Sequence, residues 1–156
     1  MKKYLQKKLN NEKGMTLIEL LAVIVIIAII AAIAIPAISN IIENSRVGAI
    51  KSDAQNVLSA VQLAGSELNV TSFDNTAFES ETSLGGYIED IGSFDEGSFT
   101  GAVLEDGEWK LSAEGIDGGV SITFLESTKS DIQAVANNDE DGAGTVTIDR
   151  DYTAAP

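Results

Sequence analysis

The sequence predicts an α+β fold in which one long N-terminal helix packs on an antiparallel sheet of three or four strands. Apolar residues are concentrated in one uncharged run near the N-terminus, and a helical apolar period continues beyond it. The C-terminal half instead alternates short strand-like segments with turn dipeptides. A length of 156 residues allows one compact domain beside such a helix.

The first predicted element is an uncharged run of 23 residues from Leu20 to Ile42. As a helix it covers about 35 Å, which is enough to cross a bilayer core of about 30 Å. Residues 1–14 carry five lysines against one glutamate, a net charge of +4, whereas residues 43–156 carry five basic and 22 acidic residues, a net charge of −17. The positive-inside rule therefore predicts a cytoplasmic N-terminus and an outward-facing acidic body.

The residues leave three interpretations of this N-terminus open. A secretory signal peptide would use the small-x-small site at residues 32–34, but Glu19 near the start of the apolar run and Pro36 just after the site argue against it. A plain single-pass anchor is the second interpretation. The third depends on the segment Lys13–Glu19, which reads KGMTLIE.

This segment resembles the processing site of type IV prepilins and pseudopilins, the class III signal, in which a basic leader ends in glycine. An apolar residue follows in that family, and a glutamate stands at the fifth mature position. The resemblance implies that a membrane prepilin peptidase cleaves between Gly14 and Met15 and that the new amine of Met15 is methylated. Met15 stands where the family commonly has phenylalanine, and the chain has no cysteine for the C-terminal pair of many pilins.

The resemblance also implies an organisation and a function. Residues 1–14 are the cleaved leader, residues 15–42 a transmembrane and filament-core helix, and residues 43–156 an extracytoplasmic globular domain. The precursor would be stored in the lipid of the cytoplasmic membrane. The pilus assembly machinery would then polymerise it with copies of itself into a surface filament for adhesion or motility, as the major pilin of a type IV pilus. A pseudopilin of a type II secretion piston and a competence pilin for DNA uptake are the alternatives.

Two residues of the apolar run each have two interpretations. Glu19 is a first-turn acid that complements the helix dipole, or, after cleavage, the partner of the Met15 amine of a neighbouring subunit. A carboxylate in a membrane segment is costly and is functional by default. Pro36 removes one hydrogen bond of the helix, which produces a kink or, as the resemblance suggests, a point of helix break and local unwinding on assembly.

The helix is predicted to continue past Ile42 and to end near Asn69. Its apolar residues recur at steps of mostly three and four, which place Arg46, Lys51, Asp53, Gln55 and Glu67 elsewhere on the helix. The apolar stripe consists of Val47, Ile50, Ala54, Val57, Leu58, Val61, Ala64 and Leu68.

Segment 73–87 has no clear period and is predicted to be a connecting loop with a short helical turn. Segments 98–104 and 108–112 flank Asp106-Gly107, a dipeptide suited to a tight hairpin turn. Segment 120–125 follows Gly118-Gly119 as a third strand, and segment 145–149 is a fourth. Their large apolar residues, Phe99, Trp109 and Phe124, are expected to pack on the helix stripe.

The composition removes most catalytic chemistry, and the protein is expected not to be an enzyme. The chain has no cysteine and no histidine, so thiol nucleophiles, imidazole bases and nitrogen- or sulfur-ligated zinc are excluded. Segment 142–144 (GAG) lacks the lysine of a phosphate-binding loop. The net charge of −14 argues against direct nucleic-acid binding, which depends on lysine and arginine.

One acidic loop is a candidate calcium site. Asn137, Asp139 and Asp141, followed by glycine, match the opening half of an EF-hand loop, but its twelfth position is Ile148 instead of glutamate. A solvated loop without metal is the alternative. A weak site of about 10⁻⁴–10⁻³ M would be occupied outside the cell. Some secretion pseudopilins hold calcium in a C-terminal loop, so the resemblance supports calcium by analogy.

Overall fold

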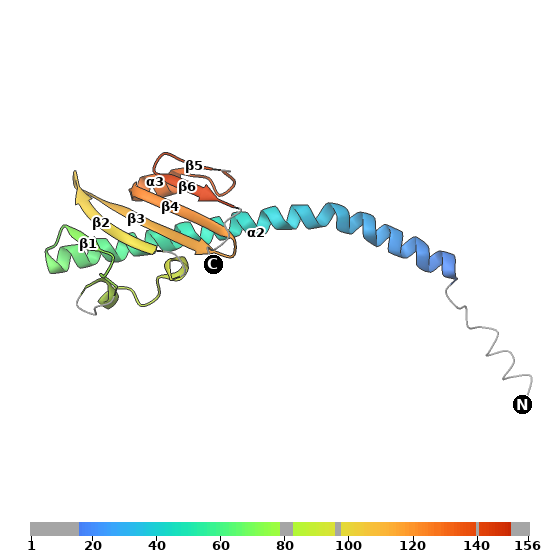
Figure 1. The fold of residues 1–156 in the computed structure, drawn as a ribbon, viewed down its shortest axis with the longest axis horizontal. Helices are drawn as coiled ribbons and strands as arrows, with labels where there is room; N and C mark the ends of the chain where they lie inside the picture. The colour runs from blue at the N-terminus through green and yellow to red at the C-terminus, as the bar shows by residue number, and fades with distance from the viewer. Residues whose placement is uncertain (1–15, 79–82, 96–97, 140, 151–156) are drawn as a thin grey trace, which may run out of the picture. The chain divides into compact units, whose positions relative to one another are not determined.

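The computed structural model describes residues 16–78, 83–95, 98–139 and 141–150. The chain forms two compact units, Met1–Asn40 and Ile41–Pro156, and helix α2 (Leu17–Leu68) contributes to both (Figure 1). In the described part of the chain, the strands, two short 3-10 helices (η1 and η2) and a short α-helix belong to the second unit. In chain order its further elements are β1 (Ser72–Asp74), η1 (Leu84–Gly86), η2 (Gly92–Phe94), β2 (Ser98–Glu105), β3 (Glu108–Asp117), β4 (Val120–Ser127), α3 (Lys129–Ala134), β5 (Gly142–Ala143) and β6 (Val146–Asp149).

The predicted stripe of α2 lies on the buried face of the helix within the second unit, except at its last member, Leu68. Its members from Val47 to Ala64 are at most 1% exposed. Leu68 is 40% exposed because the helix ends there. Lys51, which the apolar period placed elsewhere on the helix, is only 8% exposed, so that prediction is wrong. Lys51 lies four residues after Val47 and three before Ala54, which is the spacing of the stripe itself.

The end of α2 agrees with the prediction, and its cap explains the position. Asn69 adopts a left-handed conformation with φ of 54°, which asparagine tolerates better than most residues. The amide of Val70 then donates to the carbonyl of Gly65 at 3.2 Å. This is the long hydrogen bond of a Schellman cap, and it satisfies a carbonyl that the helix leaves unpaired.

The sheet has the strand order β1-β2-β3-β4-β6-β5, and every neighbouring pair is antiparallel. Two tight turns set the register of its centre. Asp106 and Gly107, with φ of 53° and 83°, join β2 to β3, and the Gly118-Gly119 pair, with φ of 51° and 92°, joins β3 to β4. A two-residue turn with positive φ at both central residues has a backbone twist that matches the twist of the two strands it joins.

All four predicted strands are present, as β2, β3, β4 and β6, but the predicted count of three or four is too low. The two additional strands have three and two residues, which is too short for a period-two pattern to be visible in the sequence. β1 lies where a loop was predicted, with Phe73 paired to Ala102 of β2. The predicted helical turn of that loop is η1.

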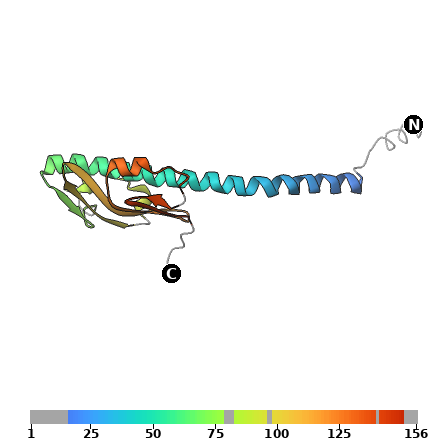
Figure 2. The ribbon, with the colours of Figure 1, turned by 90° about the horizontal axis from the view of Figure 1, so that it is seen from above.

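The core lies between one face of the sheet and the second part of α2, as Figure 2 shows. Phe99, Trp109 and Phe124 are at most 8% exposed, as expected. Trp109 packs tightly against the helix, because a Cβ atom at Gly65 would stand 2.3 Å from the Cζ2 atom of its indole ring. The ring also contacts Phe73 of β1 at a centroid distance of 5.5 Å. Gly65 therefore allows the helix and the sheet to approach closely.

We predict that Gly65→Ala lowers the melting temperature of the full chain in detergent micelles. Overpacking a core costs about 1–3 kcal/mol. This exceeds the gain of about 1 kcal/mol in helix propensity. Fluorescence of Trp109, the one tryptophan of the chain, reports the unfolding of this unit. Ser66→Ala, on the exposed side of the same turn, is the control and should leave the melting temperature unchanged or slightly higher. A stabilised Gly65→Ala variant would contradict the close packing.

Candidate functional site

The start of α2 is a capping box formed by Thr16 and Glu19. The Oε2 atom of Glu19 accepts from the Thr16 amide at 2.8 Å and from the Thr16 hydroxyl at 2.7 Å. The Glu19 amide in turn donates to Oγ1 of Thr16 at 3.2 Å. These reciprocal bonds satisfy amides that the first helical turn leaves without partners. The sequence analysis did not identify Thr16, although a threonine three residues before a glutamate at the start of an apolar run is the signal for such a box.

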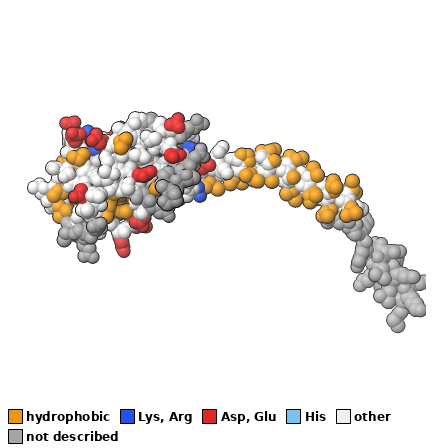
Figure 3. Space-filling model, in the orientation of Figure 1, with side chains coloured by type: hydrophobic (Ala, Val, Ile, Leu, Met, Phe, Trp, Pro, Cys, Tyr) orange, Lys and Arg blue, Asp and Glu red, His pale blue; other side chains and the backbone are white. Residues whose placement is uncertain are grey.

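Glu19 is the one charged residue between Leu17 and Ile42. The large apolar side chains of residues 17–38 are between 47% and 87% exposed within the first unit. Figure 3 shows these hydrophobic side chains in orange along the helix. Among the described residues, α2 is the one helix long and apolar enough to cross a membrane. An apolar surface of this size needs lipid or another protein to cover it.

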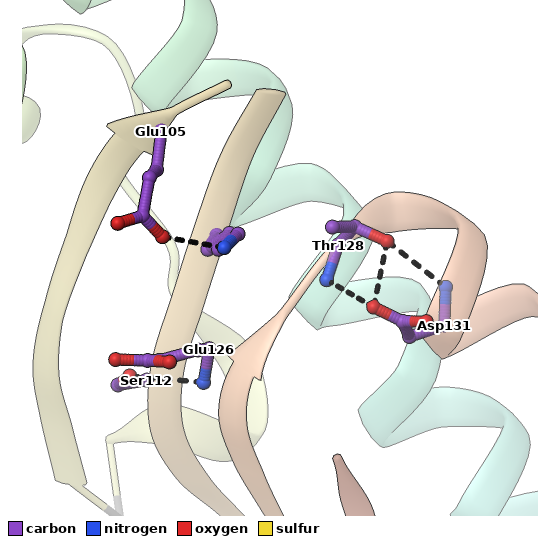
Figure 4. Close-up of polar contacts among 6 residues, drawn as sticks. Glu105, Ser112, Glu126, Thr128 and Asp131 are labelled. Atoms are coloured by element: carbon purple, nitrogen blue, oxygen red, sulfur yellow. Dashed lines mark hydrogen bonds and ion pairs between the residues drawn. The ribbon is translucent and has the colours of Figure 1, made fainter. Parts of the chain in front are cut away.

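The same box begins α3, which shows that its chemistry is a general helix cap. Oδ2 of Asp131 accepts from the amide and the hydroxyl of Thr128, and the Asp131 amide donates back to that hydroxyl (Figure 4). Ile132 in the following turn is fully buried, so this cap begins a helix that packs on its own domain. Glu19 differs in that its cap lies at the start of an unpartnered apolar helix.

Comparison with known protein families matches residues 9–35 to the prokaryotic N-terminal methylation motif. This segment is similar to the class III signal peptide of type IV pilins. This signal supports a type IV pilin-like or pseudopilin precursor, which is a structural and non-enzymatic kind of protein. Together with the apolar helix it indicates membrane insertion and processing by prepilin peptidase. Neither a curated protein nor a solved structure matches the chain.

The matched segment includes the predicted processing residues, Gly14 and Met15, but both lie outside the residues that the structure describes. Cleavage, methylation and the pairing of the Met15 amine with Glu19 therefore stay predictions. Pro36 lies inside α2, and the helix continues through it. The unwinding of the helix at Pro36 also stays a prediction.

The candidate calcium loop follows α3, and two basic side chains of the protein lie against it. The ammonium of Lys51 donates to Oδ1 of Asn137 at 3.2 Å. The guanidinium of Arg150 donates to the carbonyls of Asn137 and Asp139, each at 2.8 Å. The carbonyl of Asp141 accepts a hydrogen bond from the Ile148 amide at 3.1 Å. Several oxygens of the loop thus already accept hydrogen bonds from the protein itself.

The position that would complete an EF-hand is part of the core. Ile148 is 4% exposed and pairs with Ile122 of β4, so it faces away from the loop. Among the described residues, no group of three or more acidic side chains is placed to hold a metal ion. Glu140 lies outside those residues. Calcium binding by Asn137, Asp139 and Asp141 stays a prediction.

We predict that Thr128→Val raises the pKa of Asp131 toward its ordinary value of 3.8. The hydrogen bonds from the Thr128 hydroxyl and amide hold the pKa of this carboxyl below that value. Because the folded-state pKa is lowered, the cap contributes its full stability above pH 3.8 and loses it as the pH falls through the folded pKa. An NMR titration of the Asp131 carboxyl carbon measures the change. Thr128→Ser keeps the hydroxyl and should keep the low pKa. An unchanged titration in the valine variant would contradict this origin of the shift.

Proposed function

We propose that the chain is the precursor of a structural subunit of a type IV pilus. The observation that supports this proposal is the coincidence at one helix start of a methylation motif, a capped Glu19 and an exposed apolar helix. Cleavage between Gly14 and Met15 removes the basic leader, residues 1–14. Residues 15–42 then hold the subunit in the membrane and later form the filament core, while residues 43–156 form the outer domain.

The charge distribution supports an outward-facing body. Residues 1–14 have a net charge of +4 and residues 43–156 a net charge of −17. The leader therefore stays in the cytoplasm when the helix inserts. A strongly acidic body keeps the outer domains soluble and weakens non-specific adsorption to anionic polymers.

Glu19 can hold its cap and bind a neighbouring subunit at the same time. Both hydrogen bonds from Thr16 go to Oε2. In the described part of the chain, Oε1 accepts no hydrogen bond, and an ionised carboxylate offers about four acceptor positions. The methylated amine of Met15 in an adjacent copy is a suitable donor for Oε1. In an apolar filament core this pairing is favourable because the alternative is an unpaired charge. It would select the register in which the helices pack.

The same site is compatible with a pseudopilin of a type II secretion piston and with a competence pilin. Imaging of filaments on the cell surface, with labelling of this chain, distinguishes the three. Long filaments in which this chain is the most abundant subunit indicate the major pilin and support roles in adhesion or motility. Short filaments that depend on an outer-membrane secretion channel indicate a pseudopilin.

We predict that the mature protein begins at Met15 and carries one methyl group on its amine. The intact mass of membrane-extracted protein should equal that of residues 15–156 plus one methyl group. Gly14→Ala should leave uncleaved precursor in the membrane, because the residue before the cleaved bond is altered. Met15→Leu, an apolar replacement, is the control and should be processed normally. A mature terminus at Met1 or at Ile35 would exclude the pilus subunit.

We predict that Glu19→Leu inserts into the membrane at least as well as the native chain but assembles poorly, since the intersubunit charge pair is lost. Two variants separate pairing from capping. Glu19→Gln keeps an amide oxygen for the cap and removes the charge, so it should also reduce filament yield. Thr16→Ala removes the hydroxyl of the cap and keeps the charge, so it should assemble.

Quantification of sheared filaments against total membrane-inserted subunit measures these effects. Normal filament yield from both Glu19 variants would refute the pairing role. Loss of filaments in Thr16→Ala with normal yield from Glu19→Gln would assign the role of Glu19 to the helix cap.

A further inference from the structure

Lys51 is the most deeply buried charged residue among those that the structure describes. It is 8% exposed and lies on the stripe of α2 that faces the core. Lysine is almost never buried without a partner, because removing an ammonium from water is costly. The chain offers only five basic residues after residue 42, so the position of each one is informative. A buried ammonium in an acidic body therefore indicates a specific electrostatic role.

The partners of Lys51 all belong to the segment that follows α3, more than 80 residues away in the sequence. The ammonium donates to the carbonyl of Val135 and to Oδ1 of Asn137, the latter at 3.2 Å. The carboxylate of Asp139 adds a favourable charge interaction. The carbonyl and the amide oxygen are ligands of the types that hard cations bind in proteins, and the carboxylate supplies negative charge nearby. We refer to residues 135–139 as the clasp loop.

The helix surface is shaped for this loop. A Cβ atom at Gly48, one turn before Lys51, would stand 2.8 Å from Nδ2 of Asn137. The amide of Asn137 therefore lies in a notch that glycine leaves open, with its nitrogen toward Gly48 and its oxygen toward Lys51. Gly48 and Lys51 are three residues apart, so they share one face of α2.

A second cation holds the clasp loop through its backbone. Arg150, after β6, donates to the carbonyls of Asn137 and Asp139 and lies 3.9 Å from a carboxylate oxygen of Glu43 on α2. The loop also carries its own turn, in which the Ala136 amide donates to Oδ2 of Asp139 at 2.7 Å. Two of the five basic residues of the acidic body thus converge on one five-residue segment.

We propose that the clasp loop is a cation-binding loop whose resident cation is the ammonium of Lys51, with Arg150 as a second clamp. The lysine takes the place that a metal ion would hold beside the carbonyl of Val135 and the amide oxygen of Asn137. The order of the C-terminal part of the domain then depends on a covalently attached cation and not on the calcium concentration outside the cell. Removal of the lysine side chain converts the same oxygens into a site for a small free ammonium ion.

Hydrogen exchange of the full chain in detergent micelles tests the proposal. In Lys51→Ala, exchange in residues 132–139 should be on the order of tenfold faster than in the native chain, because the loop loses its anchor on α2. Propylammonium chloride in excess supplies the missing atoms from Cγ to Nζ and should restore slow exchange. Propanol and sodium chloride at the same concentrations should not. Millimolar calcium should leave exchange in the native chain unchanged.

Three further variants complete the design. Lys51→Met keeps most of the buried stem and removes the charge, so it should also accelerate exchange. Gly48→Ala keeps the charge and fills the notch. Helix propensity alone predicts that it stabilises α2, whereas displacement of Asn137 predicts faster exchange in the clasp loop. Lys129→Ala removes an exposed lysine of α3 and is the matched charge control, which should leave the clasp loop unchanged.

Trp109 fluorescence establishes that each variant is folded before exchange is measured, and if Lys51→Ala does not fold, Lys51→Met and Gly48→Ala decide the outcome. Native exchange rates in Lys51→Met would overturn the role of the ammonium. Faster exchange in Lys51→Ala that propylammonium does not reverse would overturn the cation site. Equal acceleration in Lys129→Ala would show a general effect of net charge and would also overturn it.

Discussion

The apolar surface of α2 must be shielded from water along its whole length. The rest of the structure depends on what covers each part of this surface. From Val47 to Gly65 one face of the helix is covered by the sheet of its own domain, and Gly65 leaves room for the Trp109 ring to pack against it. From residue 17 to residue 38 the described chain supplies no cover, and the large apolar side chains there remain exposed on every face of the helix. A helix that is covered by its own domain at one end and uncovered at the other agrees with the proposed subunit, which would use lipid first and copies of itself later.

Two charged side chains, Glu19 and Lys51, lie on the apolar surfaces of α2, and they are stabilised in different ways. Glu19 is stabilised locally, by the amide and hydroxyl of Thr16, and one of its oxygens remains available for another molecule. Lys51 is stabilised by residues distant in sequence, and its ammonium donates hydrogen bonds to two oxygens of the same domain. The first arrangement suits a contact between subunits, and the second suits the internal closure of a domain. The same physical requirement, that a charge removed from water needs partners, accounts for both.

The lack of cysteine gives the contacts of the C-terminal segment a particular importance. A disulfide or a bound metal ion is a common way to hold a loop of a small secreted domain. Here the described polar contacts that hold residues 135–139 are the hydrogen bonds of Lys51 and Arg150 and the turn between Ala136 and Asp139. The side chain of Val135 is also buried in the core. Two attached cations thus hold a loop for which the sequence left calcium coordination and a solvated loop without metal as alternatives.

Local features of the sequence were sufficient for the methylation motif, the long helix and four of the strands. The motif is a contiguous segment, the helix has an uninterrupted apolar period and an asparagine that caps it, and the strands are bounded by Asp106-Gly107 and Gly118-Gly119. Only the tertiary structure decided the remaining features. β1 and β5 form because longer strands offer them free edges. A bulge opposite Ser112, where Glu126 has φ of 52°, interrupts the alternation of β4, so that Leu125 and Glu126 are exposed one after the other. Lys51 can be buried because two oxygens accept hydrogen bonds from its ammonium. These oxygens belong to residues 84 and 86 positions further along the chain. The periodicity of a helix identifies its buried face, but the partner that a charge on that face meets depends on contacts that no local pattern contains.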